Sequence, residues 1–168
     1  TLQNILAAQD LRDVKMLQMF LLDSTAGVRA KAAFAAGSVQ DTQLVPQLVS
    51  LLADRDASVR TTAAFALGQM NSVVDSIQRR NISKDLAARL GVENDERVLE
   101  RLIEALGKMG DPPSLIALLE RVPSLSSRRL KGEIALSIGR YAYRGIKSPT
   151  ATDFAVTLLN QLGDGARW

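Results

Sequence analysis

The apolar positions of this chain repeat at a regular spacing. The stretch Asp54–Met70, DRDASVRTTAAFALGQM, reads as a polar turn followed by a helix of small apolar residues with a glycine near its end. The stretch Asp23–Val39, DSTAGVRAKAAFAAGSV, has the same order of residue types 31 residues upstream. Because chance rarely keeps so many identities in register, the sequence predicts a repeat protein in which each copy stacks on its neighbours.

Two weaker copies follow, at Asn94–Met109 and Ser126–Tyr141. The spacing to the first of them is 39 residues, so about eight residues are inserted within the segment 71–94. We expect this segment to form two short helices and to protrude as a loop, because insertions in solenoids usually emerge on one face.

A second apolar segment follows each copy. Thr42–Ala53, TQLVPQLVSLLA, places Leu44, Leu48 and Leu51 on one helical stripe. Each unit therefore reads as helix, turn, helix, and neither helix can cover its apolar face without a neighbouring unit. The pattern predicts an all-α, right-handed superhelix of four to five helix pairs in a single domain. Its expected units are 1–22, 23–53, 54–93, 94–122 and 123–162.

Composition narrows the chemistry that this chain can perform. Hydrophobic residues make up 46% of it and aromatic residues only 4%, which suits closely packed helices rich in alanine and leucine. No uninterrupted apolar run reaches about 18 residues, so we expect no membrane span. The chain has neither cysteine nor histidine, which excludes Cys/His zinc sites, thiol nucleophiles and Ser-His-Asp triads. We therefore expect no enzymatic activity, no cofactor and no metal site.

The chain does not begin with methionine, so we expect it to be a piece of a longer protein that carries further domains. Its compartment stays open. The cytoplasm fits the sequence, and so does the cell envelope if a signal peptide was removed.

The sequence VRTTAAFALGQM resembles the first helix of a HEAT repeat, of the armadillo-like family of helical repeats. The resemblance covers nearly the whole chain. It implies that the second helices line an inner, concave face. It also implies a ladder of aspartate and arginine side chains between neighbouring repeats, formed here by Asp23, Arg29, Asp54 and Arg60. Leu99 and Lys131 replace the arginine in the later copies, so we expect the ladder to be interrupted there.

A narrower likeness concerns the order NILAAQDLRD, AAFAAGSVQD, AAFALGQ and YRG along the chain. It is similar to the repeat region of certain bacterial HEAT proteins that also carry a cyclophilin-type prolyl isomerase domain. The likeness implies an accessory repeat domain, with catalysis in a domain that this chain lacks.

HEAT-type stacking implies a non-catalytic scaffold that binds a protein or peptide along its concave face. The side chains that we expect to meet this partner are polar groups on the second helices and basic groups in the inserted segment: Gln43, Gln47, Ser50, Arg79 and Arg80.

Nucleic-acid binding is the alternative, because HEAT-like alkylpurine glycosylases hold DNA on a basic concave surface. Residues 112–168 carry 8 basic and 4 acidic residues. The candidate set is Arg121, Arg128, Arg129, Lys131, Arg140, Arg144 and Lys147, with Tyr141 and Tyr143. These positions do not share one helical stripe, so we expect any DNA binding to be weak and non-specific.

Two further predictions concern packing. The glycines at equivalent places of the four copies are expected to allow close helix contact or to end a helix: Gly37, Gly68, Gly107 and Gly139. Phe65 is expected in the core, where its replacement by alanine would cost roughly 3–5 kcal/mol.

Overall fold

A computed structural model describes residues 1–146 and 148–162 of the chain. The basic residue Lys147 and the C-terminal residues 163–168 lie outside the described residues. The described part forms the α-helices α1 (Leu2–Asp10), α2 (Val14–Leu21), α3 (Ala26–Val39), α4 (Val45–Leu51), α5 (Ala57–Gln69), α6 (Ser76–Val92), α7 (Glu96–Met109), α8 (Pro112–Arg121), α9 (Arg128–Tyr143) and α10 (Pro149–Leu162). Short 3-10 helices are η1 (Thr42–Leu44), η2 (Met70–Ser72) and η3 (Val122–Ser124).

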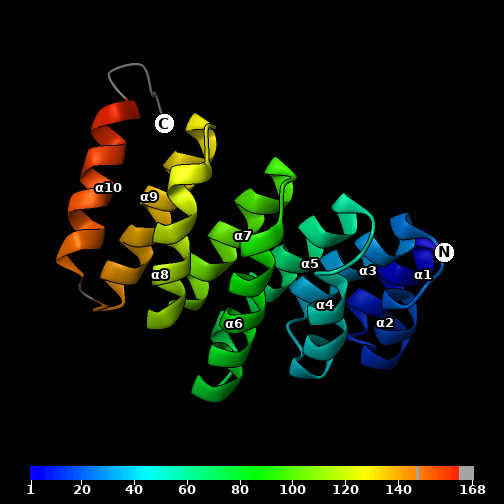
Figure 1. Cartoon of the computed structure of the whole chain (residues 1–168). Coiled ribbons are helices and arrows are strands. Elements are labelled where there is room, and N and C mark those ends of the chain that lie inside the picture. The colour runs from blue at the N-terminus through cyan, green and yellow to red at the C-terminus, as the bar shows by residue number, and fades with distance from the viewer. Residues whose placement is uncertain (147, 163–168) are drawn as a thin grey trace.

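The predicted all-α solenoid is confirmed, with helices throughout the described ranges and no strand among them. The helices follow one another as first and second members of pairs, and the pairs form a row from the N-terminus to the C-terminus (Figure 1). The second helices α4, α6 and α8 lie in front of the first helices α5, α7 and α9 in this view. The row therefore has one side built from first helices and one from second helices.

Aspartates fix where several helices begin. Asp13, Asp56 and Asp95 each accept a backbone N–H from the first turn of α2, α5 or α7. Such an acceptor satisfies a donor that has no partner within the helix. Asp10 is the last residue of α1, and Asp13 caps α2 by accepting the backbone N–H of Met16 at 3.0 Å.

The inserted segment does not protrude as a loop of two short helices, so that prediction is wrong. It lengthens one second helix, and α6 runs without a break over 17 residues. Asp75 and Gln78 form a capping box that starts α6. Its buried Ile82, Leu86 and Leu90 recur every four residues, so packing on one stripe holds the helix through the polar residues at its centre.

Three of the four equivalent glycines allow first helices to touch. A Cβ built on Gly37 would lie 3.0 Å from the Cα of Ala66, and one on Gly68 would lie 3.1 Å from the Cα of Ala105. On Gly107 the Cβ would meet the side chain of Ser137 at 2.6 Å. The first helices therefore approach too closely for a side chain at these positions.

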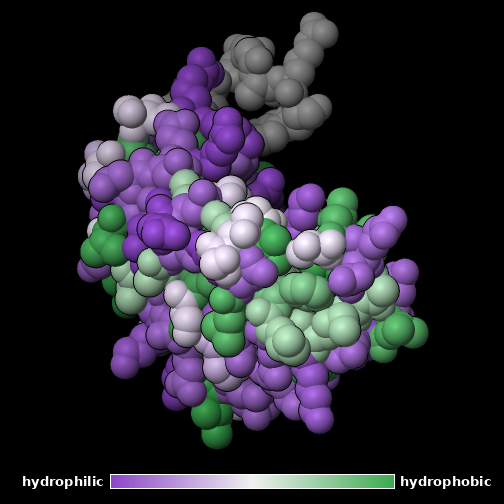
Figure 2. All heavy atoms as spheres, turned by 90° about the vertical axis from the view of Figure 1, so that its right-hand side faces the viewer, coloured by the Kyte–Doolittle hydropathy of each residue, from purple (hydrophilic) through white to green (hydrophobic). Residues whose placement is uncertain are grey.

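The N-terminal end of the row exposes apolar side chains. On α1, Leu2 and Leu6 are about half exposed, and on α2 Met19 and Leu22 are largely exposed. Figure 2 faces this end and shows apolar residues at the surface among hydrophilic ones. In the described part of the chain no further helix pair stacks on this side, so apolar groups of the kind that stacking buries remain exposed here.

Phe65 lies at the surface and not in the core, which corrects the prediction. It is half-buried on α5, and its ring stacks on that of Phe34 on α3, with ring centroids 5.6 Å apart and planes 7° apart. Phe34 is 54% exposed. The small residues of α3 and α5 fill the interior between these helices, so the larger rings are displaced outward.

We expect Phe65→Ala to cost about 1–2 kcal/mol of unfolding free energy, because only part of the ring leaves a packed environment. Leu67→Ala, two residues on and fully buried, should cost about 2–5 kcal/mol. Urea melts of both variants provide the measurement. A cost for Phe65→Ala equal to or above that of Leu67→Ala would place the ring in the core after all.

Candidate functional site

Arginines join consecutive repeats through the turns. Arg29 on α3 bonds both carboxylate oxygens of Asp54, with Nε–Oδ2 at 2.7 Å and Nη2–Oδ1 at 2.9 Å. Its Nη1 donates to the backbone carbonyl of Asp23 at 2.8 Å. The guanidinium bonds lower the pKa of Asp54 despite its burial. A structural role for these contacts remains our prediction.

Arg60 repeats this geometry one unit later, but its partner is Glu93. Arg60 Nε lies 2.8 Å from Glu93 Oε2, and Arg89 Nη2 lies 2.6 Å from the same oxygen. Our sequence interpretation overlooked Glu93. The 39-residue spacing of the copies aligns it with Asp54, so the repeat pattern contained the signal.

A cavity of about 320 Å³ lies between α6 and α8 on the side of the second helices. Arg80 and Lys84 on α6 line it together with Pro113 on α8. Arg80 is one of the residues that we expected to bind a partner. Its guanidinium is mostly exposed and lies 3.8 Å from a carboxylate oxygen of Asp111, which also lines the cavity.

Three polar residues of the α6–α8 cavity are buried: Ser83, Asp111 and Ser114. The Ser83 hydroxyl has no hydrogen-bond partner among the described residues, and its side chain is fully buried. Ser114 pairs with the buried hydroxyl of Tyr141 at 2.6 Å and donates to the Asp111 carbonyl at 2.7 Å. Burial raises the pKa of Tyr141 to about 12, so its hydroxyl stays protonated at neutral pH. Asp111 precedes α8 and is 8% exposed, but its carboxylate makes no capping hydrogen bond to the first turn of that helix.

The other predicted partner residues are spread along the second helices. Gln43 lies in η1 and is exposed, and Ser50 on α4 bonds the Pro46 carbonyl at 3.0 Å. The side-chain oxygen of Gln47 is buried without a partner in the described structure. Arg79 is held on α6 by the Asn71 carbonyl at 3.0 Å. Of the two adjacent arginines, Arg80 faces the α6–α8 cavity.

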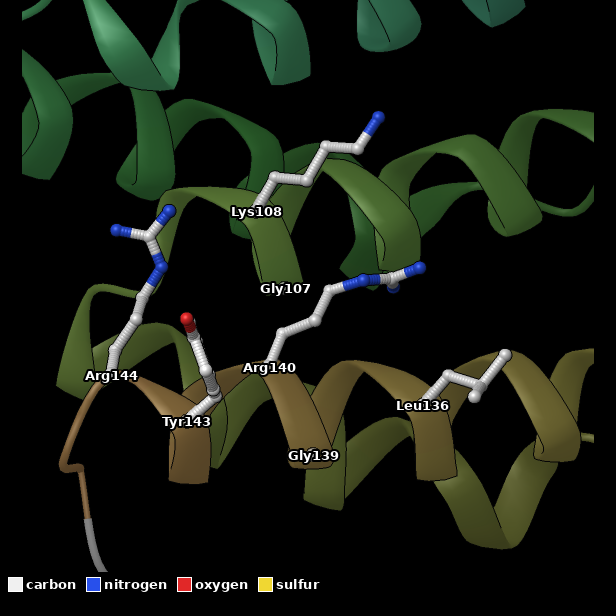
Figure 3. Close-up of a pocket in the computed structure, with 7 residues that line it drawn as sticks. All are labelled: Gly107, Lys108, Leu136, Gly139, Arg140, Tyr143 and Arg144. Atoms are coloured by element: carbon white, nitrogen blue, oxygen red, sulfur yellow. The ribbon is translucent and has the colours of Figure 1, made fainter.

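A second cavity, of about 360 Å³, lies between the first helices α7 and α9. Its lining comprises Gly107, Lys108, Leu136, Gly139, Arg140, Tyr143 and Arg144. Figure 3 shows Tyr143 between Arg144 and Arg140 on α9, with Lys108 opposite on α7. Arg140, Arg144 and Tyr143 belong to the basic set predicted from the sequence, whereas Gly107 was predicted only to allow helix contact.

The basic set does not form one continuous surface. Arg129 pairs with Glu100 at 2.6 Å, and Arg140 pairs with Glu133 at 2.6 Å. Tyr141 is fully buried and cannot stack on a base. Several of these charges are therefore neutralised locally, which weakens the attraction to a phosphate backbone.

The described ranges contain neither a candidate metal centre nor a candidate membrane-spanning helix. No group of three or more potential metal-ligating side chains occurs there. No helix in that part of the chain combines the length and apolar character that crossing a bilayer requires.

Residues 14–79 match a protein-family model described as HEAT repeats. Among solved structures, the chain is similar to the crystal structure of an engineered protein, with a TM-score of 0.57 and 20% sequence identity over 99% of this chain and 85% of that chain. At that identity the likeness shows the fold alone. No curated protein matches the chain. The family match identifies HEAT repeats in residues 14–79, which is less than half of the chain, and the likeness to the solved structure extends the shared fold to nearly all of it.

Proposed function

We propose that the chain is a non-catalytic scaffold that binds a protein or peptide along its second helices, with the α6–α8 cavity as the main anchor. The observation that carries this proposal is the cavity itself, which lies on the side of the second helices and has apolar residues and the mostly exposed Arg80 in its lining.

The chemistry of the α6–α8 cavity fits one side chain of a peptide. Ala87 and Pro113 form an apolar part of the cavity wall, and the aliphatic parts of the Arg80 and Lys84 side chains extend it. A volume of about 320 Å³ is at the lower end of small-ligand pockets, which begin at roughly 300 Å³. We infer that an apolar side chain of the partner enters this cavity.

The rim of the cavity favours an acidic neighbour of that apolar side chain. Arg80 is 76% exposed, and its contact with Asp111 is long at 3.8 Å. A pair of this kind contributes little to stability, so the guanidinium is free to turn towards a carboxylate of the partner. Lys84 adds a second positive charge at the rim.

The partner would continue along η1 and α4, where Gln43, Gln47 and Ser50 carry amide and hydroxyl groups. Such groups bond an extended peptide backbone. An accessory role beside a prolyl isomerase domain, and the presence of further domains, remain predictions of the narrower sequence likeness.

The test is a comparison of two adjacent alanines on α6. Peptides are selected from a random library on the intact chain, and their affinities are measured by fluorescence anisotropy. Ala87→Trp fills the cavity and should weaken binding at least about ten-fold, which corresponds to about 1.4 kcal/mol. Ala88→Trp is the matched control, because Ala88 is exposed and does not line the cavity.

Selected peptides should share an apolar residue next to an acidic one. Equal affinities for both tryptophan variants, in proteins with unchanged helical circular dichroism, would contradict the α6–α8 cavity as the anchor.

A further inference from the structure

We propose that the α7–α9 cavity is a second binding site, which takes a small ligand with an aromatic ring and an attached oxyanion, such as a phosphate or carboxylate. This site lies among the first helices and does not depend on the peptide site between α6 and α8. The shape of the cavity walls, the charge around them and the position of Arg144 favour such a ligand.

The walls provide a flat apolar space. Gly139 contributes no side chain, and a Cβ built on it would meet no atom within 4 Å, whereas Ser137 fills the corresponding space beside Gly107. Leu136 is 46% exposed and Tyr143 is 94% exposed at the same cavity. An exposed ring and an exposed leucine beside Gly139 leave room for a planar group to lie against the tyrosine.

The charges around this space do not cancel. Lys108 Nζ pairs with Glu104 at 2.8 Å, and Arg140 pairs with Glu133. Arg144 has no carboxylate partner within 4.0 Å in the described part of the chain, and its bonded side-chain partner is the neutral amide oxygen of Asn71 at 3.0 Å. Three basic groups thus face two carboxylates, which leaves a positive charge for an anion.

Arg144 is positioned by the fold. A Cβ built on Gly110 would lie 2.5 Å from the Cδ of Arg144. The Arg144 side chain can therefore lie in this position because residue 110 is glycine. Gly110 also ends α7 with a φ of +63°, a conformation that favours glycine. Asn71 holds Nη2 at the far end, and no hydrogen bond from Nε or Nη1 is found among the described residues. A guanidinium that is held at one nitrogen and open at others suits an oxyanion.

Aromatic and cationic groups already associate next to this cavity. The Lys108 ammonium lies 5.8 Å from the ring centroid of Phe65, which in turn stacks on Phe34. The side chains of Lys108, Arg140 and Arg144 line the cavity and extend in different directions (Figure 3). Their charged ends diverge and do not form the line that an extended phosphate backbone requires, whereas a compact anion needs only one of them, Arg144. We therefore infer a small ligand in preference to a nucleic acid.

Nuclear magnetic resonance titration of the intact, ¹⁵N-labelled chain tests this site. The backbone amides of Gly107 and Gly139 serve as reporters. Phenyl phosphate and benzoate carry both a ring and an anion, inorganic phosphate lacks the ring, and benzyl alcohol lacks the charge. We expect the two aromatic anions to bind at least about ten-fold more tightly than either partial probe, because ring and charge act together.

Two variants test separately how the aromatic ring and the negative charge of the ligand contribute to binding. Gly139→Leu places a side chain in the open space at the cavity and should weaken phenyl phosphate at least about ten-fold. Arg144→Gln should weaken the aromatic anions about five-fold or more and leave benzyl alcohol unchanged. Gly91→Leu on α6 is the control, because a Cβ there also meets no atom within 4 Å and Gly91 is not among the cavity residues.

Three results would overturn the proposal. One is equal binding of inorganic phosphate and phenyl phosphate. Another is equal affinity of phenyl phosphate for Gly139→Leu and Gly91→Leu. The third is a single-stranded oligonucleotide that shifts the same glycine amides at concentrations about a hundred-fold below those of phenyl phosphate, which would assign the surface to nucleic acid.

Discussion

Glu93→Ala should lower the unfolding free energy by about 3–5 kcal/mol, because it leaves a half-buried arginine without its partner. The Glu93 side chain is 3% exposed and accepts six hydrogen bonds. Four come from the guanidinium groups of Arg60 and Arg89, and two come from the backbone N–H groups of Asn94 and Asp95. One carboxylate thus joins α5, α6 and the start of α7.

Urea melts at neutral pH provide this measurement. Glu120→Ala on α8 is the control, because Glu120 is exposed, and it should change the unfolding free energy by no more than about 0.5 kcal/mol. Arg60→Lys should also destabilise, since lysine keeps the charge but not the planar pair of donors. A loss below about 1 kcal/mol for Glu93→Ala would mean that the repeats stack without this contact.

The same carboxylate predicts how stability depends on pH. Burial alone would raise the pKa of Glu93, but the bonds from Arg60, Asp95, Arg89 and Asn94 outweigh it and lower the pKa from 4.5 to about 2. The folded state therefore binds this proton less readily than the unfolded state. The contribution, about 3 kcal/mol, is complete above pH 4.5 and disappears as the pH falls towards 2. Glu93→Gln should remove this part of the acid dependence.

Gly107→Ala should destabilise the protein by about 1–3 kcal/mol, whereas Gly139→Ala should stabilise it by up to about 1 kcal/mol. The two glycines hold equivalent places in α7 and α9. At Gly107 the new Cβ would meet the Cα of Ser137 at 3.0 Å and its Oγ at 2.6 Å. That hydroxyl donates to the Ile103 carbonyl at 3.0 Å, so a shift would break a buried bond. At Gly139 only the gain in helix propensity remains.

Thermal and urea melts of both alanine variants provide the comparison. Opposite signs for the two changes would support the close approach of α7 and α9. Stabilisation by both alanines would show that Ser137 moves aside without cost, and the close packing of first helices would then not limit the residue at 107.

The repeat pattern in the sequence predicted the helix pairs, because stacking demands the same small apolar residues at the same places in each copy. The predictions from this pattern were wrong about the length of α6 and about the place of the large Phe65 side chain. The insertion contains no strong helix breaker between Ser76 and Leu90, so it extended α6 as a helix. Phe65 has the right residue type for a core, but alanines already occupy the space between the first helices, and the ring packs on Phe34 at the surface.

The two cavities could not be predicted in the same way. Each is formed by residues from helices that are consecutive in the solenoid but apart in sequence, and each depends on side-chain size at single positions. Arg80 was identified from its charge, whereas Ser83 and Asp111 carry no signal in the sequence alone. Ser83 is fully buried without a hydrogen-bond partner among the described residues, and Asp111 is 8% exposed, and both properties depend on how the helices pack.

Hydrogen exchange of the chain with and without a library-selected peptide tests the proposed function most directly, because it maps where the partner lies. Our account predicts slowed exchange, on peptide binding, of backbone amides in α6 near Arg80–Ala87 and at the start of α8 near Asp111–Ser114. Slowed exchange confined to the first helices α3, α5, α7 and α9 would contradict the assignment of the partner site to the second helices.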